Sequence, residues 1–167
     1  AKLTLVLTWG PKPYLPDPMP AAKTVVESFR TIGTEVSIVQ PRDRGEYVGH
    51  LERSDYDLLL AGWIADTTLA ADFLDSLLHS EMVTSKSAPR ASAYNLSRWR
   101  DPGTDRALEK FRRSEDVKDL LPIAKTVVEQ GLLVPLLHGK LIAVSHRDVR
   151  RFLPSPLGRS PLGDVEI

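Results

Sequence analysis

The segment Ala61-Gly62-Trp63-Ile64-Ala65-Asp66 contains the residue types and spacing best suited to recognising a ligand. It closes an apolar run that begins at Tyr56, and it places a carboxylate three residues after a large aromatic side chain. In open α/β sheets, ligands bind outside the carboxyl ends of the strands. Trp63 could supply a flat apolar surface there, and Asp66 a fixed anion for a cationic ligand group.

The same segment has a second interpretation that needs no ligand. Trp63 would then belong to the core, and Asp66 would be the N-cap of the next helix. Caps of this kind are common where a strand leads into a helix, so the residues taken alone favour this second interpretation.

Motifs for catalysis or metal binding are missing from the sequence. It has no cysteine, which excludes disulfides, thiolate metal sites and cysteine nucleophiles. It has no P-loop, no GxGxxG and no GxSxG motif. The histidines lack the spacing of a zinc or catalytic site: His50, His79, His138 and His146. We therefore expect a protein that is not an enzyme and that binds no metal or cofactor.

Charge gives no reason to expect nucleic acid as a partner. The 22 basic residues balance the 22 acidic ones, so the formal net charge is zero and no overall field attracts a polyanion.

Hydrophobic patterning predicts an α/β fold. The first 63 residues alternate strand, helix, strand, helix, strand, which predicts βαβαβ with right-handed crossovers. Residues 10–20 hold five prolines, which predicts a surface loop after the first strand. The expected strands are residues 3–9, 35–39 and 56–63, and the expected helices are residues 22–32, ending at Gly33, and 47–51.

The rest of the chain is predicted to contain mainly helices. We expect helices at 69–78, from Asp101-Pro102 onward, and from near Asp119 to Gly131. Residues 80–92 predict a mobile loop. Two strands are predicted at residues 132–137 and 141–144, joined by a tight turn at 138–140. Residues 1–153 are thus expected to form one α/β lobe, and 154–167 a tail rich in proline and glycine.

The AGWxAD segment, with Phe73 seven residues after Asp66, resembles a signature of the peptide-binding proteins of ABC transporters. Further segments follow in that family's order: Asn95-Leu96-Ser97-Arg98-Trp99 leading into Asp101-Pro102, and Val134-Pro135-Leu136. The resemblance covers almost the whole chain. The chain resembles the C-terminal lobe of members of the extracellular solute-binding protein family 5, the oligopeptide, dipeptide and nickel-binding type.

This resemblance implies a lobe of a type II periplasmic binding protein, with a mixed, mostly parallel sheet flanked by helices. It implies that Asp66 pairs with the free α-amino group of a peptide and that Trp63 lines the cleft. Asn95 and Trp99 match further motif positions and are additional ligand-binding candidates. The implied partners are a peptide or small solute, a first lobe and the membrane permease of an ABC importer, in the periplasm.

Thr67-Thr68-Leu69-Ala70-Ala71 departs from the family's Asp-Pro-rich stretch, which predicts a remodelled cleft. The sequence begins Ala1-Lys2-Leu3, without Met or a signal peptide, which suggests a processed product or a piece of a larger protein. A cytoplasmic ligand-sensing or protein-interaction domain of a bacterial regulator therefore stays open as an alternative. The surface that would face a first lobe includes Trp63 and Trp99. We expect it to form an apolar patch that favours self-association.

Overall fold

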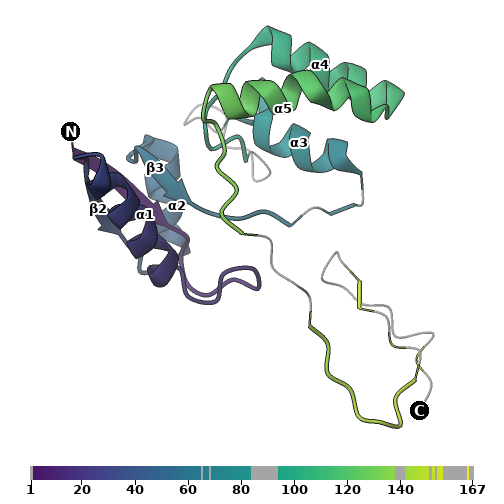
Figure 1. Cartoon of the computed structure of the whole chain (residues 1–167), viewed down its shortest axis with the longest axis horizontal. Coiled ribbons are helices and arrows are strands. Elements are labelled where there is room, and N and C mark those ends of the chain that lie inside the picture. Colours follow the sequence, from purple (N-terminus) through teal and green to yellow (C-terminus); the bar gives the residue numbers. More distant parts are fainter. Residues whose placement is uncertain are drawn as a thin grey trace.

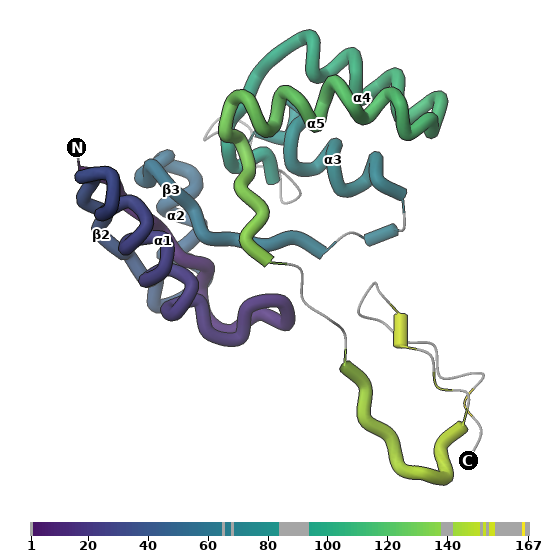
Figure 2. The backbone as a smooth tube through the Cα atoms, in the orientation of Figure 1, coloured from purple at the N-terminus to yellow at the C-terminus, as the bar shows by residue number. Residues whose placement is uncertain are grey.

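The computed structural model describes residues 2–64, 66–67, 69–83, 94–137, 142–150, 152, 154–155 and 165. A small parallel sheet with two helices forms the first part of the chain, and a group of three helices forms the second (Figure 1). Residues 142–150 run away from both parts without packing into either core (Figure 2). The α/β fold class expected from the sequence is confirmed.

The sheet has three strands: β1 (Lys2–Leu7), β2 (Glu35–Val39) and β3 (Leu58–Leu60). Their order is β2-β1-β3, and both pairs are parallel. All three predicted strands are present, but β1 and β3 are shorter than predicted. The pair Leu7↔Leu60 is the last in the β1–β3 ladder, and Thr8 N–H donates one further bond to the Leu60 carbonyl at 3.0 Å. Residues 61–64 therefore leave the sheet and are available to line a site.

Two helices cross between these strands: α1 (Met19–Thr31) and α2 (Arg44–Arg53). The chain moves outward from β1 to β2 and then back past β1 to β3. Right-handed crossovers then place α1 and α2 on opposite faces of the sheet, as Figure 1 shows. Ala22 of α1 packs against Leu5 and Leu7, which face it from β1. Gly33 follows α1 with φ +76°, the left-handed conformation expected for a glycine just after a helix.

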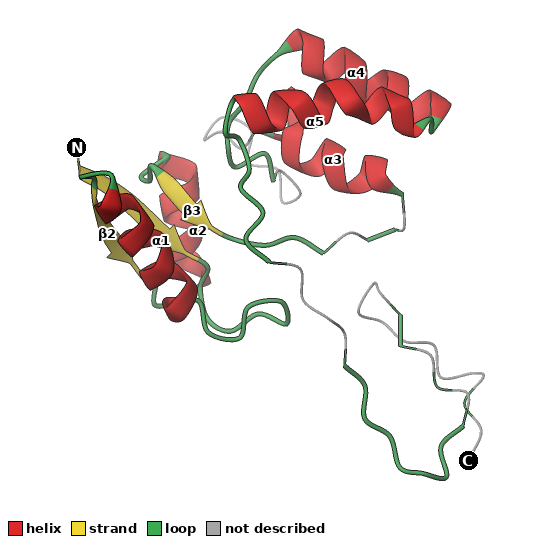
Figure 3. Cartoon of the chain, viewed as in Figure 1, coloured by secondary structure: helices red, strands yellow, loops and turns green. Residues whose placement is uncertain are grey.

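The second part consists of α3 (Ala70–Leu78), α4 (Pro102–Ser114) and α5 (Leu120–Glu129), as Figure 3 shows. Single-turn 3₁₀ helices, η1 (Ser80–Met82) and η2 (Val117–Asp119), precede α4 and α5. Leu78, Leu108 and Ile123 form a second core, separate from the core of the sheet. The predicted helix starts at Asp101 and Asp119 are confirmed, because these residues are the N-caps of α4 and α5.

The two late strands predicted from the sequence are not confirmed. Residues 132–137 and 142–144 form no strand, and residues 138–141 lie outside the described part of the chain. Leu132 and Leu133 pack against the core of the three helices, but the apolar side chains beyond them are exposed. A strand requires a neighbour for its backbone hydrogen bonds, and the described residues offer these segments none. The proposed loop at 80–92 begins with η1, and its residues 84–92 lie outside the described residues, as does most of the tail.

Candidate functional site

The candidate site lies at the carboxyl edge of the sheet, where the chain leaves β1 and β3. Trp63, which follows β3, is half-buried, and its ring contacts that of Tyr94 with centroids 4.1 Å apart and planes at 49°. The Trp63 Nε1–H is buried and has no hydrogen-bond partner in the described part of the chain. Aromatic contact, rather than a hydrogen bond, therefore holds the indole in place.

Tyr14 reaches the same place from the proline-rich loop after β1. A Cβ atom built on Gly62 would lie 2.3 Å from Cε2 of the Tyr14 ring, so this ring lies directly on the backbone that precedes Trp63. Tyr14, Trp63 and Tyr94 together are called the aromatic wall here. No sequence motif singled out Tyr14. The sequence did offer a signal: Tyr14 is an aromatic residue in the loop that follows β1, and β1 pairs with β3.

Asp66 is exposed, and no cation lies within ion-pair distance of its carboxylate among the described residues. Its backbone N–H donates to Oδ2 of Asp72 at 2.9 Å. The interpretation of Asp66 as the N-cap of the next helix is wrong, because Leu69 occupies the N-cap position of α3. The Asp66 side chain therefore has no structural task in the described contacts and is available to a ligand.

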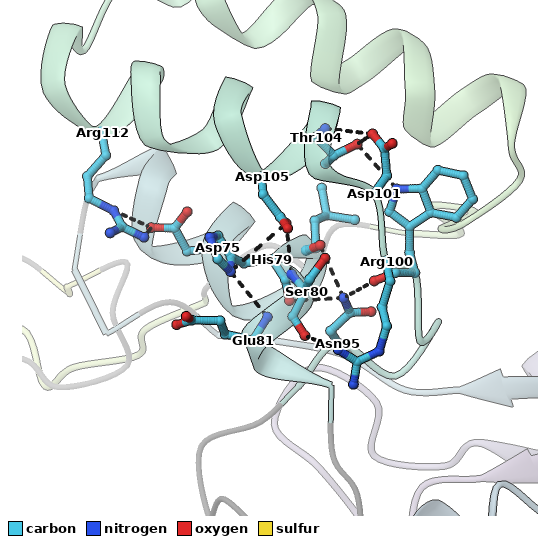
Figure 4. A network of polar contacts seen from close by, with 12 residues as sticks. Asp75, His79, Ser80, Glu81, Asn95, Arg100, Asp101, Thr104, Asp105 and Arg112 are labelled. Atoms are coloured by element: carbon cyan, nitrogen blue, oxygen red, sulfur yellow. Dashed lines mark hydrogen bonds and ion pairs between the residues drawn. The ribbon is translucent and has the colours of Figure 1, made fainter.

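Asn95 is buried, with 1% of its surface exposed, and its polar atoms are used within the chain (Figure 4). Nδ2 lies 3.1 Å from the carbonyl oxygens of Leu78 and His79 and 2.9 Å from that of Trp99. Oδ1 accepts a hydrogen bond from the Ser97 hydroxyl at 2.9 Å. With two amide hydrogens shared among three carbonyls, this side chain ties residues 95–99 to the end of α3.

Trp99 and its neighbours fasten the same segment to α4. The Trp99 Nε1–H donates to Oγ1 of Thr104 at 3.2 Å, and Asp101 accepts the Thr104 N–H at 2.6 Å. Trp63 and Asp66 therefore both follow the end of β3 within six residues, whereas Asn95 and Trp99 are occupied by contacts inside the chain. These contacts hold Tyr94, the residue before Asn95, against Trp63.

A second group of polar contacts in Figure 4 links α3 to α4. Arg112 donates from Nε and Nη2 to Oδ2 of Asp75, at 2.9 and 2.7 Å. Asp105 accepts the Ser80 N–H at 2.9 Å, and Nδ1 of His79 accepts the Glu81 N–H at 3.2 Å. These contacts stabilise the surface on which residues 94–101 lie.

Two phenols at or near the aromatic wall have a raised pKa, those of Tyr14 and Tyr47. Burial raises the pKa of Tyr47, and the nearby Tyr14, Tyr56 and Tyr94 raise it further. Burial also raises the pKa of Tyr14, although hydrogen bonds with the Gly62 backbone and Thr8 act in the opposite direction. Among the described residues, no group of three His, Asp or Glu side chains is arranged to hold a metal ion. Asp66 offers a ligand an exposed carboxylate three residues after Trp63 of the aromatic wall.

A parallel sheet with an aromatic surface and an exposed carboxylate at its carboxyl edge is the arrangement of a ligand-binding α/β lobe. No protein-family model matches the chain. It is 24% identical over 160 residues, 93% of its length, to Di/tripeptide-binding protein 1 of Pseudomonas aeruginosa. It is 27% identical over 155 residues, 90% of its length, to Di/tripeptide-binding protein 2 of the same organism. The chain spans 28% of the length of each of these relatives.

Solved structures show the same relationship. A dipeptide-binding protein from Pseudoalteromonas sp. SM9913, in complex with Met-Leu, matches with a TM-score of 0.74 at 23% identity. HbpA2 from Haemophilus parasuis matches with a TM-score of 0.67 at 15% identity. Each match covers 99% of this chain and 32% of the other. The resemblance found in the sequence is confirmed: the curated relatives are di/tripeptide-binding proteins, and the chain has the fold of part of a dipeptide-binding protein.

Proposed function

We propose that this chain forms one side of the ligand site of a peptide-binding protein that serves an ABC importer, and that it is not an enzyme. The observation that carries this proposal is the exposed Asp66 carboxylate, which has no cation partner among the described residues and follows Trp63 by three residues. The relatives, named as di/tripeptide-binding proteins, support a short peptide as the ligand.

The chemistry of the edge fits the amino end of a peptide. The α-amino group is a cation at neutral pH, and a carboxylate binds it through charge-assisted hydrogen bonds. The aromatic wall, whose Trp63 precedes this carboxylate by three residues, offers an apolar surface for the first side chain of the peptide. Asn95 and Trp99 would hold the wall in position and would not contact the ligand.

The remaining ligand contacts would come from a first lobe. The peptide would be bound outside the cytoplasm and handed to a membrane permease. None of the helices among the described residues is long and apolar enough to cross a membrane. A tight site buries about 70–90% of its ligand, whereas one lobe buries one side of it. The chain alone is therefore expected to bind short peptides weakly, with a dissociation constant on the order of 0.1–1 mM.

An NMR titration of the ¹⁵N-labelled chain tests the proposal. Met-Leu is expected to shift the signals of the Trp63 Nε1–H and the Asp66 amide, and N-acetyl-Met-Leu, which lacks the cationic amino group, is not. Asp66→Asn should abolish the Met-Leu shifts, whereas Glu27→Gln, on an exposed site of α1, should keep them. Equal binding of the acetylated peptide would overturn the role of Asp66. Submicromolar binding of Met-Leu would overturn the one-sided site.

A further inference from the structure

The contact between Gly62 and Tyr14 joins two loops that lie 48 positions apart in the sequence. A Cβ atom at Gly62 would come within 2.3 Å of Cε2, 2.5 Å of Cδ2 and 3.0 Å of Cζ in the Tyr14 ring. Distances under 3.0 Å do not occur between a real Cβ and a ring, so any other residue at position 62 displaces this ring. The glycine is needed here for close approach, since its φ is not in the left-handed region.

Tyr14 is fixed at both ends of its side chain. Its ring packs with the core of the sheet, among partly buried neighbours of Leu7 and Leu60. Burial raises the pKa of its hydroxyl, and hydrogen bonding with the Gly62 backbone and with Thr8, a buried residue that directly follows β1, opposes this rise. The proline-rich loop that carries Tyr14 is closed by paired backbone bonds between Lys12 and Leu15, at 3.1 and 2.9 Å. The ring therefore connects a rigid loop to the strand end.

Trp63 is consequently held from two sides. The Tyr14 ring lies against the residue before it, and the Tyr94 ring lies against its indole at 4.1 Å. Tyr94 is itself positioned by Asn95, whose amide is bonded to three carbonyls. The indole has no hydrogen bond of its own in the described part of the chain, so its orientation depends on these neighbours.

We propose that Tyr14, seated on Gly62, is a positioning residue for the peptide site and gives it a preference for peptides with an apolar first side chain. Tyr14 fixes the backbone at Gly62, and with it the direction in which Trp63 leaves β3. The aromatic wall then keeps its place relative to Asp66, which binds the amino group next to that first side chain. This inference rests on the proposed function, but the Tyr14–Gly62 contact can be tested without a ligand.

A double-mutant cycle tests the contact. Gly62→Ala is expected to lower the melting temperature by about 5 °C, because the added methyl group overpacks the ring. In a Tyr14→Ala background the space is open, so Gly62→Ala should have almost no further effect. Gly49→Ala is the control, because a Cβ at this site in α2 meets the flexible end of Arg53, and it should leave the melting temperature unchanged or raised. Additive effects of the two substitutions would overturn the contact.

Peptide titrations of the whole chain test the positioning role. The chain is expected to bind Met-Leu about fivefold more tightly than Gly-Leu, because the longer side chain packs on the aromatic wall. Tyr14→Ala should bring this ratio close to one, and Tyr14→Phe, which retains the ring, should restore it. A loss of folding stability alone lowers both affinities equally and does not change the ratio.

The outcomes separate the two proposals. A coupled Tyr14–Gly62 pair with an unchanged Met-Leu to Gly-Leu ratio in Tyr14→Ala would overturn the positioning role and leave the proposed function in place. A chain that shows the coupling but binds neither peptide would overturn the proposed function, and the positioning role with it. A ratio that falls in Tyr14→Ala and returns in Tyr14→Phe supports both.

Discussion

The Asp72 carboxylate, in the first turn of α3, accepts the backbone N–H of Asp66 at 2.9 Å. The same oxygen accepts the Thr67 N–H at 3.0 Å and lies 3.3 Å from the Thr67 hydroxyl. The Asp72 carboxylate thus holds the loop through its backbone, whereas the Asp66 carboxylate stays exposed. The two carboxylates therefore have different roles: Asp72 positions the loop, and Asp66 remains available for a cation.

Replacing Asp72 with Ala is expected to free the loop that carries Asp66. The two amide groups lose their acceptor, which should destabilise the fold by about 1 kcal/mol. Met-Leu binding, followed by NMR titration, should weaken about threefold because the Asp66 carboxylate is no longer held in place. Asp72→Asn retains an oxygen acceptor and should fall between Asp72→Ala and the unchanged chain. Undiminished binding by Asp72→Ala would show that the site does not depend on this loop geometry.

Asn95→Ala is expected to lower stability more than any change at the exposed Asp66. Three carbonyl oxygens lose their shared donor in a buried place, which should cost about 2–3 kcal/mol and lower the melting temperature by about 5–10 °C. Ser97→Ala removes the partner of Oδ1 alone and should cost about 1 kcal/mol. Thermal denaturation followed by circular dichroism measures both. If Asn95→Ala instead lost its affinity for the peptide while its stability stayed unchanged, this would indicate that Asn95 contacts the ligand.

Local patterns were sufficient to predict the helices and the three strands of the sheet. Alternation predicted β2 at its observed bounds, and Asp101-Pro102 and Gly131 marked helix ends, because capping depends on neighbouring residues. The contact of Tyr14 with Gly62 was not predictable in this way, since it depends on how two distant loops meet. The same holds for the hydrogen bonds of Asn95, whose partners come from the end of α3 and from residue 99. The predicted strand at 132–137 was wrong because a local pattern does not show whether a neighbouring strand is present to pair with it.

The exposed apolar side chains of the two unpaired late segments are expected to cause self-association. Their exposed fractions range from 52% to 93%: Val134, Leu136, Leu137, Ile142 and Val144. Apolar side chains crowded along an extended, unpaired backbone favour contact between molecules. Light scattering should give a mass that rises above 18.6 kDa with concentration.

The double substitution Val134→Lys and Leu136→Lys should suppress this rise, because it adds two charges to the exposed segment. Ile32→Lys, at a comparably exposed site after α1, is the control and should not suppress it. A constant monomer mass of the unchanged chain at the highest concentration would contradict the prediction.

The N-cap of α4 is expected to make stability sensitive to acid. Hydrogen bonds from the Thr104 N–H and hydroxyl hold the pKa of Asp101 below its usual value. The folded chain therefore binds this proton less readily than the unfolded chain, whose Asp pKa is about 3.9. The stabilisation is present above this pH and is lost as pH falls through the lowered pKa of the folded state.

Asp101→Asn still accepts the Thr104 N–H, so the variant should lose less stability than the unchanged chain between about pH 5 and pH 2.5. Urea denaturation across this range measures the difference, with Glu27→Gln as the exposed-carboxylate control. Parallel curves for Asp101→Asn and the unchanged chain would show that the cap is not the source of acid sensitivity.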